Sequence, residues 1–422
     1  MRKHKFTMSD LAVKPGRRVG DAELPKVCVV ILNLNGRHHL ERCFESLAAM
    51  DYPKDKLDVL LIDNGSDDGS VEECRKRWPW VRLEVNPRNV GFAPGCNQGA
   101  RLRGDASVLA FLNNDIRVDR GWLRELVQPI ARGEAAATGS KMLSWDGKTI
   151  DSAGGGVNFH GIGLAYGYKD VPSAEHDVPR KTLFACGGAM AMDARTFDEV
   201  GGFDNEFFAY YEDVDLGWRT WVLGHEVHYV PSSVCWHHHH GTSKRLPLET
   251  VRLIQVRNPL YACFKNYDDE HLRKILPVAL ALFLRRMLIV SGIPSDQPFR
   301  IEKARTADTP ARPSKISKAI GKLTRRPAPG AAGYSPVTSV CAADLIAAND
   351  LLANWEHWMQ RRAEVQSRRK RADQEIFRLF LRPMWCIEDD PQFKGLLEGS
   401  AEFFGVTKLF EGLTLMTKDP AK

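Results

Sequence analysis

The sequence lacks the cysteine pattern of a disulfide-stabilised secreted protein. Its nine cysteines are scattered and odd in number, and no two of them form a Cys-x-x-Cys pair. Such a pattern is typical of reduced thiols in a cytosol and not of an extracellular disulfide framework. Hydrophobic residues make up 43 % of the chain, so a substantial core can form without covalent links. We therefore expect a cytoplasmic globular protein.

The chain also lacks an apolar leader and a clean membrane-spanning run. Residues 1–23 are polar and basic, so they do not predict a signal peptide. The apolar stretch 275–293 has nearly spanning length, but Arg285 and Arg286 lie at its middle. Two guanidinium groups at that depth of a bilayer would be costly. We predict a packed or interfacial helix there, on a protein that is cytoplasmic or peripheral to the inner face of a membrane.

Composition and periodicity divide the chain of 422 residues into five segments. They are a disordered tail (1–24), an α/β domain (25–250), a helical extension able to meet a membrane interface (251–293), a basic linker rich in Pro and Ala (294–338) and a helical C-terminal region (339–422). The net charge of +6 is uneven, since residues 300–330 hold nine Lys and Arg against two acidic residues. No recognisable nucleic-acid-binding module accompanies them, so we expect no nucleic-acid partner.

Strand and helix patterns alternate from residue 26 to about residue 231. The apolar runs 27–32 and 57–62 are typical of strands that are buried on both faces. Short antiparallel strands and loops are expected at 145–185. The alternation predicts a mostly parallel, Rossmann-like sheet with helices on both faces.

Polar residues follow the carboxyl ends of these two buried strands and of a third strand expected at 107–112, where open parallel sheets bind ligands. They are Asn33 and Asn35, Asp63, and the run Asn113-Asn114-Asp115. Asp115 and its neighbouring amides supply oxygen ligands for a divalent cation that carries a diphosphate, and Asp63 can bind a base or ribose. The simpler alternatives are an Asn/Asp turn at 113–115 and a turn with a helix cap at 63–66.

Three carboxylates lie within four positions, at Glu212, Asp213 and Asp215, directly after the bulky run 207–211. A helix N-terminus stabilises anions, so capping explains one or two of them. Capping does not explain the aromatic run, which would place these carboxylates against apolar walls. A carboxylate held there can accept the proton of an attacking hydroxyl.

An internal run of four histidines begins at His237, directly after Trp236. Adjacent histidines cannot all converge on one ion, so the run is either a solvated loop or a source of one metal ligand. His237 is then the candidate ligand. Histidine among oxygen ligands favours manganese over magnesium.

Taken in order, these segments resemble the inverting glycosyltransferases of family 2, which have the GT-A fold, over residues 27 to 243. The resembling segments are Val30–Gly36, Asp63–Ser66, Asn89–Asn97, Asn113–Asp115, Cys186–Ala189 and Glu212–Asp213. The residues in several of these segments are most similar to those of rhamnosyltransferase-like and galactofuranosyltransferase-like members. Asn113 departs from the family's Asp-x-Asp metal motif, whose first residue is acidic.

The resemblance implies a role for each residue. Contacts to the nucleotide sugar would come from Asn33, Asn35, Asp63, Asn89, Gly91, Asn97, Asn113, Asn114 and Asp115. The acceptor would meet Gly187, Gly188 and Trp218. The catalytic pair would be Glu212 and Asp213, with Asp213 as the base. A divalent metal, Mn²⁺ or Mg²⁺, would bind Asp115 and His237, which stands 24 positions after Asp213. The implied reaction moves a sugar from a dTDP- or UDP-sugar to a glycan or lipid-linked glycan in surface polysaccharide synthesis.

Two other functional classes stay open. A sugar nucleotidyltransferase also uses a parallel sheet and acidic metal ligands, but residues 33–36 do not form the glycine-rich, basic phosphate loop that it needs. Asn113 in place of an acidic residue leaves a catalytically silent glycan-binding scaffold open, whereas the intact Glu212-Asp213 pair argues against it. The C-terminal helices either pack or form a homo-oligomer, or they attach to an anionic membrane surface.

Overall fold

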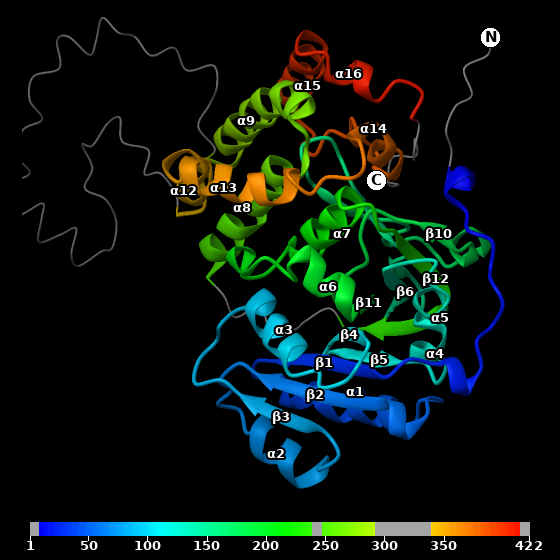
Figure 1. The fold of residues 1–422 in the computed structure, drawn as a ribbon. Helices are drawn as coiled ribbons and strands as arrows, with labels where there is room; N and C mark the ends of the chain where they lie inside the picture. Colours follow the sequence, from blue (N-terminus) through cyan, green and yellow to red (C-terminus); the bar gives the residue numbers. More distant parts are fainter. Residues whose placement is uncertain (1–7, 239–246, 292–338, 414–422) are drawn as a thin grey trace, which may run out of the picture.

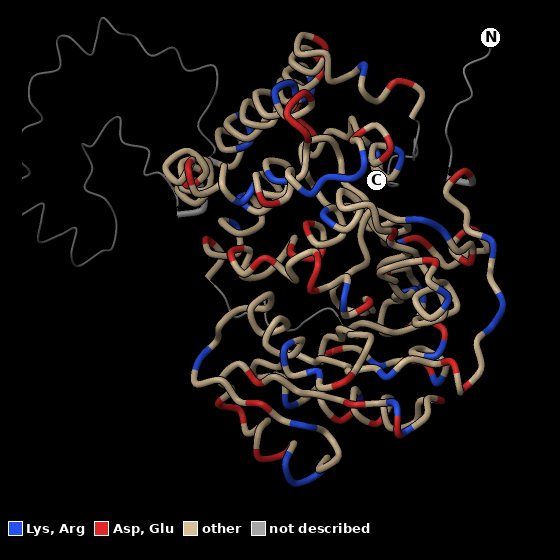
Figure 2. The backbone as a smooth tube through the Cα atoms, viewed as in Figure 1, with Lys and Arg blue, Asp and Glu red and all other residues tan. Residues whose placement is uncertain are grey.

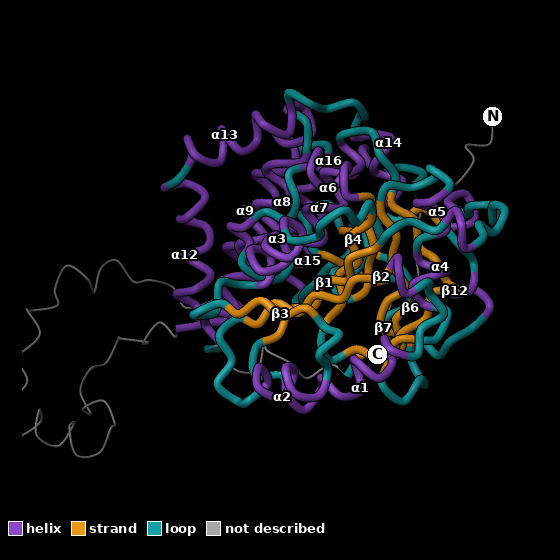
Figure 3. Tube along the Cα trace, turned by 60° about the horizontal axis from the view of Figure 1, so that its bottom comes forward, coloured by secondary structure: helices purple, strands orange, loops and turns teal. Residues whose placement is uncertain are grey.

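The computed structural model describes residues 8–238, 247–291 and 339–413. Within them a ten-stranded mixed sheet carries helices on both faces, and a group of helices from the second half of the chain covers one end (Figure 1). Figure 3 shows the strands gathered at the centre with the helices around them. The predicted α/β fold with a helical C-terminal region is confirmed. The whole predicted linker, residues 294–338, lies outside the described residues.

The sheet runs in the order β10-β12-β6-β11-β4-β1-β2-β3, with β5 added to β12 and β7 to β6. The strands are β1 (Val27–Asn33), β2 (Leu57–Asp63), β3 (Arg82–Val85), β4 (Val108–Asn113), β5 (Ile116–Val118), β6 (Ala137–Ser144), β7 (Ile150–Ser152), β10 (Arg180–Lys181), β11 (Ala189–Asp193) and β12 (Val227–His237). A separate hairpin pairs β8 (Gly155–Val157) with β9 (Gly163–Ala165). Strands β4, β1, β2 and β3 are parallel, whereas β11 runs antiparallel to β4 and β6.

Each side of the sheet has its own hydrophobic core. Successive side chains of a strand point to opposite faces, so Cys28 and Val30 of β1 enter one core while Val29 and Ile31 enter the other. All four are fully buried. Residues 27–31 of the predicted apolar run are therefore buried, because helices cover both faces of the sheet.

The helices of the sheet domain follow the strands in alternation. They are α1 (Arg37–Ala48), α2 (Ser70–Arg77), α3 (Phe92–Arg101), α4 (Trp122–Leu126), α5 (Gln128–Ala131), α6 (Ala194–Val200) and α7 (Glu212–Val222). The helical region beyond them contains α8 (Leu248–Asn266), α9 (Asp269–Ser291), α12 (Ser339–Ala353), α13 (Trp355–Gln366), α14 (Asp373–Ile376), α15 (Pro391–Phe403) and α16 (Val406–Leu409).

The predicted disordered tail does not hold for residues 8–24, which lie along the sheet domain. Leu11, Val19 and Leu24 are each only 3 % exposed. The amide of Val19 donates to Oε1 of Gln128 over 2.8 Å. Three well-separated apolar residues leave no periodic pattern in a polar sequence, so only the tertiary structure shows that each one fills a gap in the core.

Helix α9 packs through the two arginines that interrupt its apolar sequence. Arg285 reaches Asp390 over 3.0 Å, and Arg286 reaches Glu388 over 2.6 Å. Both partners lie near the start of α15, so the pairs join α9 to the last part of the chain. No helix in the described ranges has both the length and the apolarity to cross a membrane.

The basic run 361–371 is largely used inside the fold. Arg362 donates to the backbone oxygen of Phe264 over 2.6 Å, and Arg371 donates to that of His225 over 2.9 Å. Figure 2 shows basic and acidic residues interspersed along the described chain. The run therefore joins α13 and its following loop to α7 and α8, and does not form a free basic patch.

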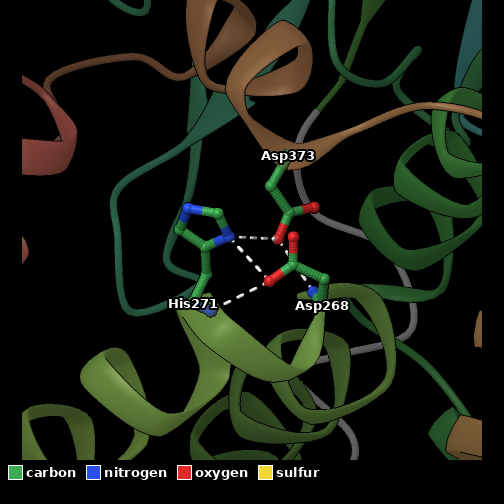
Figure 4. A group of neighbouring side chains, drawn as sticks. All are labelled: Asp268, His271 and Asp373. Atoms are coloured by element: carbon green, nitrogen blue, oxygen red, sulfur yellow. Dashed lines mark hydrogen bonds and ion pairs between the residues drawn. The ribbon is translucent and has the colours of Figure 1, made fainter.

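A cluster of Asp268, His271 and Asp373 ties the start of α9 to the start of α14 (Figure 4). Nδ1 of His271 lies 2.7 Å from Asp268 and 3.5 Å from Asp373. Burial lowers the pKa of His271, but the hydrogen bonds to both carboxylates outweigh it and leave the pKa raised. Arg369 also pairs with Asp373 over 2.8 Å, so the two carboxylates face positive charge from Arg369 and His271.

Candidate active site

A cavity of about 400 Å³ opens at the carboxyl edge of β1 and β4, in front of the N-terminus of α7. The cavity is lined by ten of the predicted site residues: Asn89, Gly91, Asn113, Asn114, Asp115, Gly187, Gly188, Glu212, Asp213 and His237. These residues come from the loop before α3, the ends of β4 and β12, the approach to β11 and the first turn of α7. The predicted spatial convergence is therefore present.

Asp115 and His237 form an ion pair at one side of the cavity. Nε2 of His237 lies 3.3 Å from Oδ1 of Asp115, and its Nδ1 lies 2.7 Å from Oδ2 of Asp151. Burial lowers the pKa of His237, but the hydrogen bonds to Asp115 and Asp151 have the larger combined effect. The net result raises the pKa to about 9. Burial raises the pKa of Asp115, and the imidazole brings it below its usual value.

This pair fits a divalent cation. A carboxylate and an imidazole face one another in a cavity, and Asp151 holds the far nitrogen of the ring. A carboxylate on the second nitrogen fixes the tautomer of a ligating histidine. Asp151 was missed in the sequence because it stands alone in the short strand β7, with no motif around it.

The catalytic pair predicted from the sequence stands at the first turn of α7. Oδ2 of Asp213 accepts from the amide of Gly187, and Oδ1 accepts from that of Val214, both over 2.8 Å. Burial raises the pKa of Asp213, and these amides offset part of that rise. An ionisable carboxylate with a raised pKa is a stronger base than one in water.

Glu212 is in a different electrostatic state from Asp213. Its side chain is buried, and among the described residues its Oε2 has no hydrogen-bond partner. Burial and the charge of Asp213 raise its pKa well above the usual value. Two adjacent carboxyls with different environments separate into a neutral acid and a base, and burial without a hydrogen-bond partner makes Glu212 the member that takes up a proton more readily.

We call Phe208–Asp213, the segment that carries this pair, the catalytic wall. Phe208, Tyr210 and Tyr211 have positive φ angles of 59°, 64° and 67°. Such angles in bulky residues cost about 1–3 kcal/mol each and persist only where the surroundings impose them. The amide of Phe92 at the start of α3 donates to the oxygen of Phe208 over 2.6 Å. A Cβ on Gly91 would lie 2.6 Å from the Phe208 ring, so only glycine permits this approach.

We call Asn33, Asp63 and Asn114, which lie at or just beyond the carboxyl ends of β1, β2 and β4, the sheet edge. Of the three, Asn114 lines the cavity. Nδ2 of Asn33 donates to Oδ2 of Asp63 over 2.8 Å, and Nδ2 of Asn114 donates to Oδ1 of Asn33 over 2.7 Å. The other oxygen of Asp63 accepts from the amides of Gly65 and Ser66. The two bonds to Gly65 and Ser66 are those of the simpler turn hypothesis. The helix cap of that hypothesis is wrong, because α2 begins only at Ser70 with Gly69 as its N-cap.

Asn33, Asn35 and Asp63 do not line the cavity. Asn35 has a φ angle of 51°, and its Oδ1 accepts from the amide of Asp67 over 2.8 Å. Direct contact of these three residues with a nucleotide therefore stays a prediction. Asn64 lines the cavity although the sequence does not predict a role for it, and its Nδ2 donates to the oxygen of Gly91 over 3.1 Å.

Asn97 lies away from the cavity, contrary to its predicted role. Its Nδ2 donates to the oxygen of Phe203 over 2.7 Å and to Asn205 over 2.8 Å. Its Oδ1 accepts from the amide of Phe203 over 3.0 Å. Both ends of the amide thus join α3 to the loop before the catalytic wall, which makes Asn97 a structural residue.

Trp218 cannot contact an acceptor. It is fully buried and packs edge-on against Tyr267 and Phe380, at ring-centre distances of 4.8 and 5.3 Å. The five positions from Asp213 to Trp218 turn a helix by about 140° beyond a full circle. The two side chains of α7 therefore face in different directions, and the prediction for Trp218 is wrong.

Known proteins match the part of the chain that carries this site. A family profile described as "Glycosyl transferase family 2" matches residues 28–200, and one described as "N-terminal domain of galactosyltransferase" matches 171–241. The N-acetylglucosaminyl-diphospho-decaprenol L-rhamnosyltransferase of Mycobacterium tuberculosis is 30 % identical over 248 residues, which are 52 % of this chain and 78 % of the relative. The O-antigen biosynthesis protein RfbC of Myxococcus xanthus is 29 % identical, over 52 % of this chain and 18 % of its own.

Among solved structures, GalNAc-T7 with UDP, GalNAc and Mn²⁺ has a TM-score of 0.49 at 20 % identity, covering 61 % of this chain and 51 % of its own. A likeness at that level is too loose to place individual residues. The chain's own mixed sheet, with helices on both faces and a helical region behind it, is GT-A-like. The two matched segments together contain every cavity residue named above, and the chain covers most of a relative that is 30 % identical. The chain therefore belongs to glycosyltransferase family 2, the enzymes that transfer a sugar from a nucleotide-sugar donor.

Proposed function

We propose that the chain transfers a hexose or deoxyhexose, with rhamnose as the first candidate, from a dTDP- or UDP-sugar to a glycan or lipid-linked glycan. The acceptor would belong to a surface polysaccharide, and the anomeric carbon would be inverted. The observation that carries the proposal is the position of Asp213, which faces the same cavity as Asp115 and His237. The rhamnosyltransferase among the relatives supports rhamnose as the candidate sugar.

In the proposed reaction Asp213 accepts the proton of the acceptor hydroxyl while its oxygen attacks the anomeric carbon. The bond from that carbon to the nucleoside diphosphate breaks on the opposite side, which inverts the configuration. The amides of Gly187 and Val214 hold both oxygens of Asp213 in place. General-base assistance of this kind contributes ~10²–10⁴ in rate. Glu212, neutral beside it, keeps a second negative charge away from the base.

Asp115 and His237 are the residues that would hold a divalent cation, with Asp151 orienting the imidazole. When bound, such a cation neutralises charge on the leaving diphosphate. The mixed oxygen and nitrogen donors favour Mn²⁺ over Mg²⁺. Asn113 lines the same cavity but offers an uncharged amide. We therefore expect weaker metal binding than two carboxylates would give.

The proposal is tested by a thermal-shift panel of nucleotide sugars with and without Mn²⁺, followed by turnover with the selected donor. The expected result is a metal-dependent shift for one donor class, and a product of inverted configuration by NMR. Binding without turnover would support a silent scaffold instead. Formation of a nucleotide sugar from a nucleoside triphosphate and a sugar phosphate would identify a nucleotidyltransferase.

We also propose peripheral attachment to an anionic membrane through α9. Leu284 and Leu288 are 49 % and 37 % exposed, next to Arg285 and Arg286. Arg285 and Arg286 are paired with Asp390 and Glu388, so the basic charge for an anionic surface would come from residues 300–330, which hold nine Lys and Arg against two acidic residues. Exposed apolar side chains that precede such a basic segment in the sequence suit the headgroup region of a bilayer. Co-sedimentation of the full chain with anionic and with neutral vesicles tests this. Salt-sensitive binding to anionic vesicles alone is expected, and no binding to either would remove the proposal.

A further inference from the structure

The catalytic wall is held from behind by a side chain of the helical region. Asn258 of α8 is fully buried. Its Nδ2 donates toward three backbone oxygens of the preceding loop and the wall, those of Phe207, Ala209 and Tyr210, over 2.9, 3.0 and 2.7 Å. An amide nitrogen has only two hydrogens, so the three carbonyls share them. Asn258 itself does not line the cavity.

The orientation of the Asn258 amide is fixed by its neighbour. Nε of Arg257 donates to Oδ1 of Asn258 over 3.2 Å, and Nη2 of Arg257 donates to the oxygen of Glu206 over 2.6 Å. A flipped amide would turn Oδ1 toward the three carbonyl oxygens and its NH₂ toward a guanidinium. Only one orientation is therefore compatible with these contacts.

This contact falls on the part of the backbone that needs support. The carbonyl oxygens of Ala209 and Tyr210 lie between the positive-φ residues Phe208 and Tyr211. Without a donor these carbonyls would lose their partner in a partly buried place, which costs free energy, and the segment could relax toward ordinary backbone angles. Such a relaxation would move Asp213, which follows two residues later. A displacement of about 1 Å at a reacting group can lower the rate ~100-fold.

We propose that Asn258 is a positioning residue that sets the placement of the base Asp213 through the catalytic wall. The inference rests on the proposed function of Asp213. Helix α8 lies outside both matched family segments, which end at residues 200 and 241. The helical region is then part of the catalytic apparatus and not only a packing extension of it.

The test compares Asn258→Ala with the wild type in the full chain. We expect kcat to fall ~10–100-fold, while the Kd for the nucleoside diphosphate with Mn²⁺, measured by calorimetry, stays within about twofold because the metal ligands lie on other elements. The matched control is Gln128→Ala, which removes another buried amide, one that holds Val19 on the far side of the sheet. This control should lose stability and keep kcat.

A second variant, Asn258→Asp, covers the case in which Asn258→Ala does not fold. Its carboxyl has the same shape but donates a hydrogen bond only when protonated. The ratio of its kcat to that of the wild type should therefore rise as the pH falls. A pH-independent ratio, or a kcat of Asn258→Ala equal to that of the wild type, would overturn the inference. An inactive wild type would instead refute the proposed function.

Discussion

Two regions that border the cavity are built in opposite ways. At the sheet edge, Asn33, Asp63 and Asn114 are buried and bound to one another at the ends of neighbouring strands. In the catalytic wall, three residues have positive φ angles and an oxygen of Glu212 has no partner among the described residues. The sheet edge is stable through local pairing, whereas the wall keeps a strained and partly unsatisfied arrangement.

The difference shows where each side obtains its support. The sheet edge rests on the register of β1, β2 and β4, which the family segment contains. The wall depends on contacts from α3 and α8, both distant in the sequence. Strain at a functional site persists only when the surrounding structure imposes it. A base with a raised pKa is the chemical result of that imposed arrangement.

The largest effect is expected from removing the base of the catalytic wall. Asp213→Asn should lower kcat by ~10²–10⁴ because general-base assistance is lost. Binding of the donor, which we propose depends on Asp115 and His237, should remain in calorimetry. An exposed carboxylate away from the cavity offers a control, and Asp119→Asn should have normal kcat. Near-normal turnover of Asp213→Asn would show that the wall does not carry the chemistry.

The next largest effect concerns the buried ion pairs that hold α7, the helix that begins in the catalytic wall. Nζ of Lys265 is buried between Asp204 and Asp215, at 2.5 and 3.0 Å. Lys265→Met would leave both carboxylates without this cation, which costs about 3–5 kcal/mol for a buried pair. Urea unfolding measures the loss. Lys274→Met, which breaks the exposed pair with Glu270, should leave the free energy of unfolding nearly unchanged. An equal loss of unfolding free energy in both variants would contradict a stabilising role for the buried Lys265 pairs.

A smaller effect is expected on the metal side of the cavity. Asp151→Asn removes the carboxylate that holds Nδ1 of His237, and such a loss typically weakens metal affinity ~10–100-fold. The Mn²⁺-dependent thermal shift should fall while kcat at saturating Mn²⁺ changes little. Asp115→Ala, which removes the proposed ligand itself, should have the greater effect. If Asp151→Asn binds Mn²⁺ like the wild type, Asp151 does not orient the ligand.

The smallest effect tests the neutral carboxyl of the wall. The pKa of Glu212 is raised in the folded state, so its favourable contribution is present at low pH and is lost as the pH rises toward the folded pKa. Gln cannot ionise, so Glu212→Gln should be more stable than the wild type at pH 8 and similar at pH 4.5. Each kcal/mol gained raises Tm by about 2–4 °C. A gap in Tm that is the same at both pH values would mean that Glu212 is ionised in the fold.

The sequence alone predicted the strand ends and the chemistry placed on them. The apolar runs of β1, β2 and β4 identify a sheet buried on both faces, and Asp115 follows one of these strands. The aromatic run before Glu212-Asp213 indicated an unusual environment for the catalytic pair. These features are local, because period and spacing along the chain determine which face and which edge a residue occupies.

The tertiary structure decided which side chains reach the cavity and which hold it in shape. Trp218 and Asn97 lie near functional residues in sequence, yet helix rotation and a loop contact direct them into the core. Asp151 and Asn258 belong to no motif, yet they orient His237 and the catalytic wall. Such partners are brought together only by packing between distant segments, and no local pattern along the chain encodes the contact.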